Sequence, residues 1–282
     1  MSNRKLWLWK GTSLGRCGAA VPAAYAGKMS ALNCLQRLRL RHHSLLAVLA
    51  ASFGLCACSI GNPVRTGQLQ TDVKAVKLGD AKSVRVEISM GAGELKIEGG
   101  ATNLLDAQFT YDVPAWKPLV EYNASGGEGR LSIRQPGGPG GARGSVRYDW
   151  NLRLNGKVPL SIDLQMGAGR TNLTLGQLSL TNLDVKLGAG EAIVDLTGDW
   201  KNDLSAHVRG GVGRATLRLP RDMGVRVAVA GGIGAINARD FNKENGLYVN
   251  DAYGKSPVTL RIDVEGGIGE IDLELPEAPP VV

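Results

Sequence analysis

Six copies of a Gly-x-Gly triplet recur along the chain, and apolar residues at alternate positions precede them. Alternation with a period of two is typical of a β-strand that buries one face. The first glycines of the last five copies lie at 167, 188, 211, 232 and 267, so the separations are 21, 23, 21 and 35 residues. A period near twenty predicts a solenoid in which each repeat forms one coil. The triplet glycines are Gly91, Gly93, Gly167, Gly169, Gly188, Gly190, Gly211, Gly213, Gly232, Gly234, Gly267 and Gly269.

Glycine suits the corners of such coils because it tolerates positive φ and lets neighbouring coils approach closely. A second apolar cluster follows most triplets, as in Leu217-x-Leu219, so each coil is expected to contain at least two strands. Gly127-Glu128-Gly129 is interpreted as a weaker copy. The polar segment from Arg239 to Ser256 occupies the long last gap and is expected to leave the stack.

These patterns divide the chain into consecutive parts. The predicted fold is an all-β solenoid with an N-terminal β section that caps the stack. Most aromatic residues of the body fall in this less regular N-terminal section. The expected parts are a leader over 1–58, a tether over 59–69, the N-terminal β section over 70–160, the Gly-x-Gly solenoid over 161–275 and a frayed tail over 276–282.

The net charge of +7 belongs to the leader rather than to the body. Residues 1–57 hold eight Lys or Arg and no acidic residue, so 33 − 8 = 25 basic residues remain against 26 acidic ones, a net charge of −1. A body this close to neutral has no electrostatic footprint for a phosphate backbone, and no nucleic-acid partner is expected. The four cysteines also lie within residues 1–58, so the folded part is expected to have no disulfide and no thiolate metal site.

The leader has the pattern of a bacterial lipoprotein signal peptide. A basic stretch precedes an apolar run from Leu45 to Leu55, which is shorter than the roughly twenty residues of a spanning helix. The run ends in Leu55, Cys56, Ala57 and Cys58, which resembles a lipobox and implies cleavage before Cys58 and lipidation of its thiol. Ser59 follows where Asp commonly signals inner-membrane retention, which favours the outer membrane, facing the periplasm, in a Gram-negative cell.

Other interpretations of this leader stay open. Cys58 could follow an ordinary cleaved signal peptide without being modified, or the apolar run could be a short uncleaved anchor. Met29 is a natural start, so residues 1–28 are interpreted as an over-extended start or a long n-region, with a transit peptide as the weaker alternative.

Chemical readings of the glycine-rich turns fail on their flanking residues. Calcium-binding repeats place Asp at the sixth position of GGxGxD, where this chain has Ala215, Ile236 and Ile271. Neither GxGxxG before a helix nor a P-loop is present. His207 is the one histidine beyond the leader, and Asp203 near it is expected to be solvated, so no zinc or serine-protease site is predicted. The acidic pairs Asp195 with Asp199 and Glu270 with Asp272 are interpreted as outward positions of strands.

The ordered series of triplets resembles the toast-rack family of bacterial envelope proteins. The stretches that carry the resemblance are SVRVEISMGAGELKIEGG, LSIDLQMGAGRTNLTL and LDVKLGAGEAIVDLTGDW, followed by the GGVG and GGIG copies, and it covers roughly residues 70–275. It implies a right-handed, single-stranded β-helix-like solenoid used in envelope sensing or protein interaction, and it supplies no catalytic residues. LiaF-like members carry membrane helices where this chain has a lipobox leader, so regulation of a histidine kinase is not transferred.

The sequence therefore predicts a non-enzymatic, lipid-anchored envelope protein without cofactor, metal or small-molecule substrate. Its expected partners are the membrane, through Cys58, and an unidentified envelope protein or a second copy of itself, because terminal coils leave strand edges to be paired. One alternative is an adhesin that binds glycan or surface polymer. Another is a degenerate polysaccharide-acting β-helix enzyme, which would need a groove with two carboxylates about 5–10 Å apart.

Overall fold

The computed structural model describes residues 66–137 and 146–276. The leader lies outside these residues, together with Leu55, Cys56, Ala57 and Cys58, the first part of the tether and residues 277–282. Within the described ranges, the chain contains no helix of the length and apolarity needed to cross a lipid bilayer.

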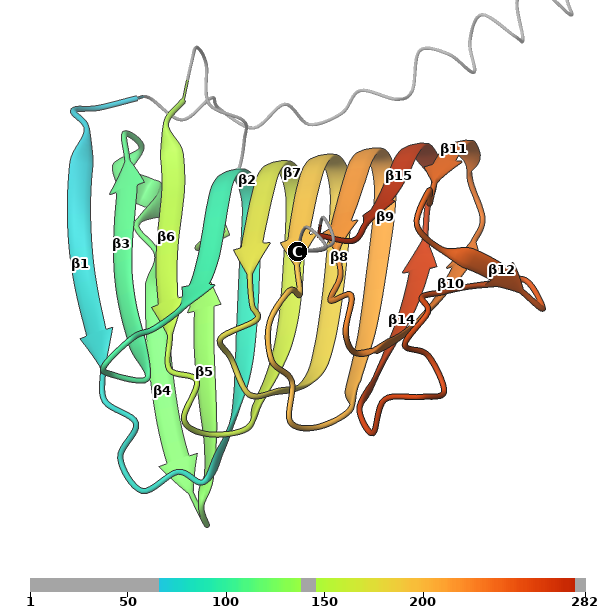
Figure 1. Cartoon of the computed structure of the whole chain (residues 1–282). Coiled ribbons are helices and arrows are strands. Elements are labelled where there is room, and N and C mark those ends of the chain that lie inside the picture. The colour runs from blue at the N-terminus through green and yellow to red at the C-terminus, as the bar shows by residue number, and fades with distance from the viewer. Residues whose placement is uncertain (1–65, 138–145, 277–282) are drawn as a thin grey trace, which may run out of the picture. The chain divides into compact units, whose positions relative to one another are not determined.

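The described chain consists almost entirely of strands (Figure 1). One short 3-10 helix, η1 (Pro114–Trp116), interrupts them. The strands of the N-terminal half are β1 (Gln70–Val76), β2 (Ser83–Gly99), β3 (Leu105–Tyr111), β4 (Leu119–Ser125), β5 (Glu128–Arg134), β6 (Tyr148–Leu154) and β7 (Leu160–Thr174). Those that follow are β8 (Leu180–Asp195), β9 (Leu204–Arg218), β10 (Gly224–Ala230), β11 (Ile233–Asn237), β12 (Asn242–Glu244), β13 (Leu247–Val249), β14 (Thr259–Glu265) and β15 (Ile268–Glu274).

The long strands β2, β7, β8 and β9 each contain a Gly-x-Gly triplet and fold over at it. Their two halves pair with different neighbours, so the hydrogen-bonded strands form two walls joined along a line of bends (Figure 1). The first wall holds, in order, β4, β5, the first halves of β2, β7, β8 and β9, then β14, β10, β13 and β12. The second wall holds β1, β3, β6, the second halves of the same strands, then β15 and β11.

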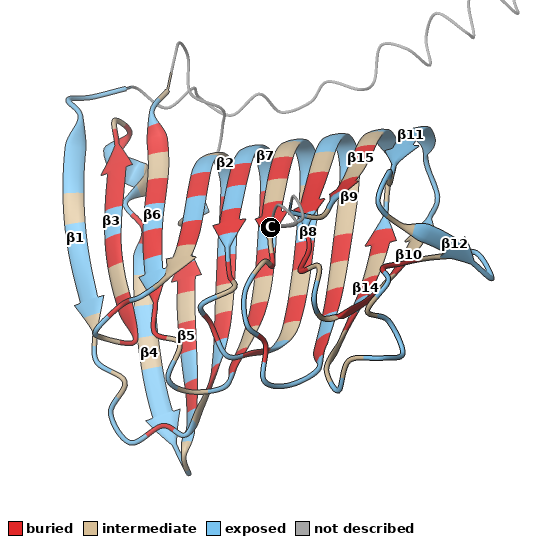
Figure 2. Ribbon diagram, viewed as in Figure 1, coloured by how far each residue is buried: buried red, intermediate tan, exposed pale blue. Residues whose placement is uncertain are grey.

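The core lies between the walls and follows the predicted alternation (Figure 2). In β7, for example, Leu160, Ile162, Leu164 and Met166 are buried while the residues between them are half-buried or exposed. Burying each such side chain contributes about 1.5–3 kcal/mol. The structure therefore confirms the all-β solenoid with Gly-x-Gly corners, in which each coil contributes one strand to each wall.

Two details of the N-terminal part differ from the sequence interpretation. Gly127-Glu128-Gly129 is not a coil corner. Gly126 and Gly127, with φ of 62° and 84°, form a two-residue hairpin turn between the antiparallel strands β4 and β5, and Glu128 and Gly129 begin β5. Strand β2 falls within the range expected for the capping section, yet it stacks in register on β7 as a full coil. Strands β1, β3, β4, β5 and β6 flank it.

The stacking order of the last coils differs from their order in the chain. The coil β14–β15 lies between β9 and the coil β10–β11, so the chain reaches the end of the stack and then returns one place. The segment between these coils forms the hairpin of β12 and β13, and β13 pairs antiparallel with β10. The 35-residue gap thus accommodates an excursion, as expected, and this excursion also covers the outer edge of β10.

Candidate binding surfaces along the bends

The triplet glycines form two columns along the stack, one glycine per coil. A Cβ added to any first glycine from Gly167 onward would lie closer than 3.0 Å to the carbonyl oxygen of the first glycine in the adjacent coil. The second glycines show the same contact, because the parallel register places Gly93, Gly169, Gly190, Gly213, Gly269 and Gly234 side by side. The backbones of successive coils therefore touch at the bends, which only glycine permits.

The backbone conformation adds a second requirement at the second column. Gly93, Gly169, Gly190, Gly213 and Gly269 have φ between 128° and 151°, a region that residues with a Cβ rarely adopt. The glycine pattern is thus explained by coil contact and backbone conformation. Across the described ranges, no group of three or more His, Cys, Asp or Glu side chains is placed to hold a metal ion.

The residue just before each triplet changes character along the stack. Met90, Met166 and Leu187 fill the inside of the bend in the coils of β2, β7 and β8. The register places Gly210 beside Leu187, and Gly266 and Gly231 continue the same column in the last two coils. Three large side chains are thus followed by three glycines.

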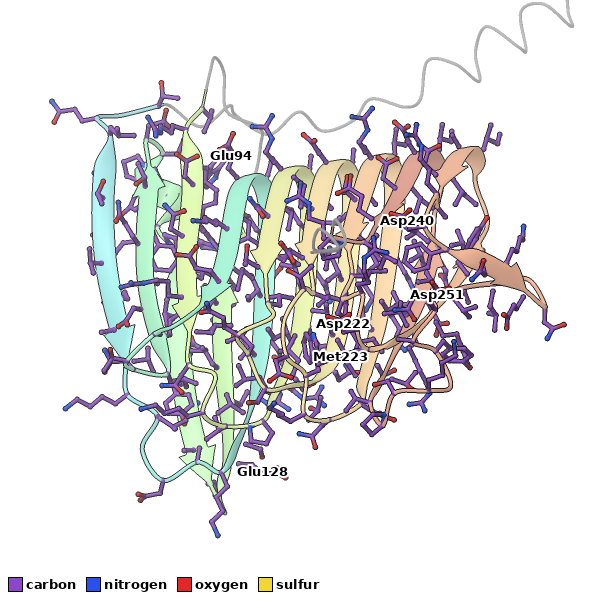
Figure 3. All side chains as sticks on the ribbon, viewed as in Figure 1. Glu94, Glu128, Asp222, Met223, Asp240 and Asp251 are labelled. Atoms are coloured by element: carbon purple, nitrogen blue, oxygen red, sulfur yellow. The ribbon has the colours of Figure 1, made fainter. Side chains whose placement is uncertain are left out.

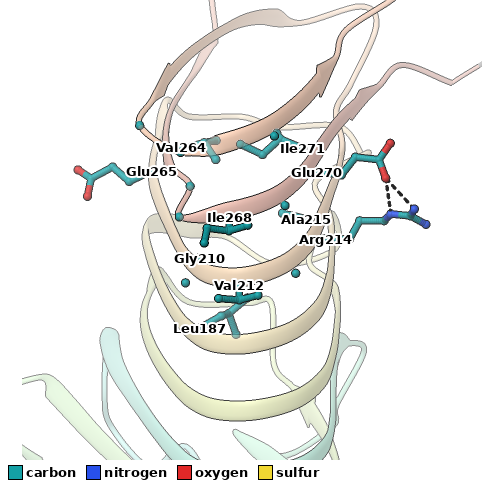
Figure 4. A pocket seen from close by; sticks show the side chains of 18 of the residues that line it. Leu187, Gly210, Val212, Arg214, Ala215, Val264, Glu265, Ile268, Glu270 and Ile271 are labelled. Atoms are coloured by element: carbon teal, nitrogen blue, oxygen red, sulfur yellow. Dashed lines mark hydrogen bonds and ion pairs between the residues drawn. The ribbon is translucent and has the colours of Figure 1, made fainter.

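The missing side chains leave an apolar cleft of about 100 Å³ inside the bends of the last three coils (Figure 4). A Cβ added at Gly210 would meet no atom within 4 Å, so this glycine borders open space. In Figure 4, Val264 and Ile271 point toward each other across the coil, and Val212 and Ile268 lie above one another at the bends.

The central residue of the triplet also changes in the coils that lack a large side chain just before the triplet. It is Ala in the GAG copies, where the bend is filled, and Val212, Ile268 and Ile233 in the copies around the cleft. These three side chains are 56%, 58% and 77% exposed and stand in register with one another. Ile236 nearby is 42% exposed. We call Val212, Ile233, Ile236 and Ile268 the C-terminal apolar patch. It holds four of the eight large hydrophobic side chains that are exposed in the described chain.

A second hollow, the bend groove, runs over the first glycine column on the outside of the coils. Its volume is about 790 Å³, and its floor is formed by Gly91, Gly167, Gly188 and Gly211. Half-buried Trp116 and Gln135 lie at its N-terminal end, where the Gln135 side chain accepts a hydrogen bond of 2.7 Å from the backbone N–H of Gly91. Its other polar lining residues are Ser89, Gln165, Lys186 and Arg209.

Charged side chains form an alternating row on the outer face of the second wall. Glu94, Arg170, Glu191, Arg214 and Glu270 stand side by side in register, one per coil, starting at Glu94 beside the bend of β2 (Figure 3). Arg170 lies 3.4 Å from both Glu94 and Glu191, and Arg214 lies 2.6 Å from Glu270. Each exposed pair contributes little free energy alone, but the alternation of sign favours one register over its neighbours.

The acidic residues considered from the sequence take structural positions. Glu270 and Asp272 lie on the outer face and pair with Arg214, and Asp195 accepts hydrogen bonds from Thr197. Asp199 pairs with Lys201. Asp195, Glu270 and Asp272 thus take outward strand positions, as interpreted, whereas the interpretation is wrong for Asp199, which lies in the connection between β8 and β9.

His207 and Asp203 do not come together as a site. His207 lies 3.4 Å from Asp263 on the first wall. Asp203 instead accepts a 2.9 Å hydrogen bond from the N–H of Thr259 and a 2.7 Å bond from Arg261. These two bonds hold the pKa of Asp203 below its usual value, and the bond from the Thr259 backbone has the larger effect.

A small hollow on the first wall is lined by two carboxylates that stand in register on neighbouring coils, Glu87 and Asp163. Arg130 lies 3.4 Å from Glu87, and Arg85 lies 3.2 Å from Asp163. Both carboxylates are therefore ion-paired on an open face.

Neither the C-terminal apolar patch nor the bend groove was predicted from the sequence. The change from Met or Leu to Gly before the triplet, together with the change from Ala to Val or Ile within it, was a visible signal for the patch. The groove depends on Trp116 and Gln135, which come from irregular segments that no repeat pattern places.

Comparison with known proteins supports the architecture. The model of the N-terminal domain of the toast-rack family (DUF2154) matches residues 65–218. The crystal structure of a candidate cell adhesion protein from Clostridium sporogenes is 30% identical, with a TM-score of 0.69 over 74% of this chain and 100% of that one. A candidate adhesin from Bacteroides fragilis is 14% identical, with a TM-score of 0.29 over 75% of this chain and 100% of that one. No curated protein matches the chain significantly.

The family match covers more than half of the chain and coincides with the coils of β2, β7, β8 and β9. The relative from C. sporogenes extends the structural likeness over the full length of that protein. Both findings confirm the resemblance carried by the ordered Gly-x-Gly copies, and the chain is a member of the toast-rack family.

Proposed function

We propose that this chain is a non-enzymatic, lipid-anchored protein of the cell envelope that binds another envelope protein through the C-terminal end of its solenoid. The observation that carries the proposal is the C-terminal apolar patch. Contiguous exposed apolar surface commonly marks an interaction site, and the four patch residues line one cleft together. The other exposed large hydrophobic residues of the described chain, Leu69, Val73, Leu119 and Tyr253, lie on other segments. Binding of an envelope protein at this patch would serve either envelope-stress sensing or the assembly of an envelope complex.

The lining of the bend groove supports a binding role over catalysis. The bend groove is lined by no carboxylate among the described residues. Glu87 and Asp163 each form an ion pair with an arginine, whereas glycoside hydrolysis uses two carboxyl groups that act directly on the substrate.

Photo-cross-linking in intact cells tests the binding surface. A photoreactive residue at Ile268 is expected to capture a specific protein, because this side chain stands in the centre of the patch. The matched control carries the same residue at Asn172, which is exposed on the outer face of the second wall in the middle of the stack. Equal capture at both positions, or none at Ile268, would contradict the proposal.

Palmitate labelling tests the anchor. Label is expected on the wild-type chain and not on the Cys58→Ala variant, because the thiol of the lipobox cysteine is the acceptor. A Cys56→Ala variant serves as control and is expected to keep the label. Label that persists in Cys58→Ala and is lost in Cys56→Ala would refute the assignment of Cys58.

The bend groove favours a second candidate function, the binding of a glycan. A floor of glycine backbone is flat, Trp116 offers an aromatic face, and Gln135 and Gln165 offer amide groups. The relative from C. sporogenes bears the name of a cell adhesion protein. Binding of a chito-oligosaccharide is expected to be lost in Trp116→Ala and retained in Trp116→Phe and in the control Tyr253→Ala. Unchanged binding in Trp116→Ala would exclude this groove.

A further inference from the structure

The two walls end differently at the terminal coil. In the first wall, β13 pairs with the outer edge of β10 and β12 pairs with β13, so this wall extends two strands past β10. In the second wall, β11 pairs with β15, and among the described residues no strand lies on its other side. One wall of the terminal coil is therefore capped and the other presents an open strand edge (Figure 1).

The open edge lacks the features that normally keep sheet edges unpaired. Its sequence, Ile-Gly-Ala-Ile-Asn, contains no charged residue, and all five residues are exposed. By contrast, β1 at the opposite end of the same wall carries Asp72 and Lys74, and Lys117 lies 2.9 Å from Asp72. Charges on an edge strand disfavour pairing with another chain, so β1 is protected and β11 is not.

The inner face of β11 also lacks cover. Ile236 stands in register with Ile271, which faces the core and is 8% exposed. Ile236 is 42% exposed because no further coil of the described chain stacks on it. A strand added beside β11 would bury Ile236 as β11 buries Ile271.

The hydrogen-bonding groups of β11 alternate in direction. The N–H of Ile233 donates to Gly267 of the neighbouring coil at 2.8 Å. In a parallel pair the groups of successive residues point to opposite sides, so Gly234 and Ile236 direct their N–H and C=O groups to the open edge. Gly234 and Ile236 thus offer backbone donors and acceptors to a strand that would lie beside β11.

The charges beside the edge indicate which strand it fits. The alternating row on the outer face ends on Glu270, and its next position, on β11, is the uncharged Ala235. Asn237 donates hydrogen bonds of 2.8 and 2.7 Å to Glu270 and Asp272, and these two carboxylates share one cation, Arg214, beside β11. A Lys or Arg on the outer face of an added strand would extend across the small Ala235 side chain toward these carboxylates.

We propose that the open edge of β11 binds an extended segment of a partner protein as an additional strand. The segment has apolar residues at alternate positions, which cover Ile236 on the inner face of β11, and a basic residue on its other face, toward Glu270. An extended peptide fits this edge better than a second copy of the chain, because the hairpin of β12 and β13 continues the first wall past the place where a second solenoid would have to stack. The inference rests on the proposed function and specifies how its partner is held.

A binding experiment with the full chain in detergent tests this proposal. The probe is a peptide of about seven residues, a usual strand length, with valines at three alternate positions and one lysine on the opposite face. The control peptide has the same composition with the alternation scrambled. Fluorescence anisotropy is expected to show binding of the alternating peptide at least about tenfold tighter than that of the scrambled one, a difference of about 1.4 kcal/mol. Replacing the lysine by glutamate is expected to weaken binding.

Amide hydrogen exchange distinguishes strand addition from docking of side chains. Saturating peptide is expected to slow exchange at Gly234 and Ile236, whose N–H groups face the open edge, and to leave Ile233 unchanged, since it already donates to Gly267. The variant Ile236→Lys is expected to weaken binding by roughly tenfold or more, because it places a charge on the edge. The control Val73→Lys, at an exposed position of β1, is expected to bind normally.

Three results would overturn the proposal: equal binding of the two peptides, binding without slower exchange at Gly234 and Ile236, or protection of these amides by self-association at rising protein concentration. In the last case the occupant is a second copy. If the peptide fails while photo-cross-linking at Ile268 still captures a protein in cells, strand addition is wrong and the proposed function stands.

Discussion

Met166 and Gly210 take equivalent places, just before the triplet on the inside of the bend, yet one fills the interior and the other leaves it open. Met166 is 4% exposed, and the hydroxyl of Thr171, which is fully buried, donates a 2.8 Å hydrogen bond to its sulfur. The residue just before the triplet therefore decides the packing of the bend. A large side chain there fills the inside of the coil, and a glycine leaves the cleft open.

Truncation of the filled bend is expected to be costly. Met166→Ala removes a buried side chain and leaves the Thr171 hydroxyl without its partner, so the free energy of unfolding should fall by about 2–5 kcal/mol. Urea unfolding measures this. The neighbouring exposed Gln165→Ala is the control and should change the free energy by less than about 0.5 kcal/mol. A loss as small in Met166→Ala as in the control would contradict this account of the bend.

At the scale of elements, the insertion of β14 and β15 between two earlier coils needs a contact that selects this place. Asp203, just before β9, supplies one: it binds the N–H of Thr259 at the start of β14 and the guanidinium of Arg261 within it. On the other side, Arg226 of β10 lies 3.8 Å from Asp263 of β14. Polar contacts on both flanks thus accompany the register of the inserted strand.

The Asp203 contact predicts a specific pH dependence. Because the pKa of Asp203 is lowered in the folded state, its ionised form stabilises the fold fully above the ordinary Asp value of about 3.9, and this contribution is lost as pH falls through the lower folded-state pKa. Wild type should therefore exceed Asp203→Asn in stability at pH 6, and the difference should vanish in strong acid. Urea titrations at a series of pH values measure it. A difference that stays constant down to the lowest pH would contradict the assignment.

At the scale of the whole molecule, the sequence predicts the architecture because each repeat of its pattern lies within one coil of about twenty residues. The alternation Leu160-x-Ile162-x-Leu164 and the triplet that follows define one coil, and the next coil carries the same pattern and stacks on it in parallel register. The order of the last coils could not be read in this way, since β10 and β14 carry the same pattern and either could stack on β9. The interpretation of Gly127-Glu128-Gly129 as a coil corner was wrong because closely spaced glycines also suit a hairpin turn, here at Gly126 and Gly127.

The candidate surfaces were harder to foresee for a related reason. The C-terminal apolar patch arises because Val212, Ile268 and Ile233 line up only after β14 and β15 take their place between β9 and β10. In chain order, Ile233 would be placed next to Val212. The open edge of β11 follows from the same rearrangement, which makes the coil β10–β11 the terminal one.

The account depends most on the claim that the triplet glycines are contacts between the backbones of adjacent coils. Gly210 and Gly211 are neighbours, and neither has a positive φ in the left-handed region. A Cβ at Gly210 would meet no atom within 4 Å, whereas one at Gly211 would press on the carbonyl of Gly188. The two alanine variants therefore differ in coil contact while sharing the same chemical change.

The free energy of unfolding of Gly210→Ala and Gly211→Ala, measured side by side, tests this claim directly. Gly210→Ala should leave the protein as stable as wild type or more stable by about 0.4–1 kcal/mol, because alanine restricts the unfolded chain without a clash. Gly211→Ala should lower the stability by about 1–3 kcal/mol, the usual cost of forcing a methyl group into a packed contact. Equal effects of the two substitutions, or a more stable Gly211→Ala, would contradict the stacked-glycine architecture.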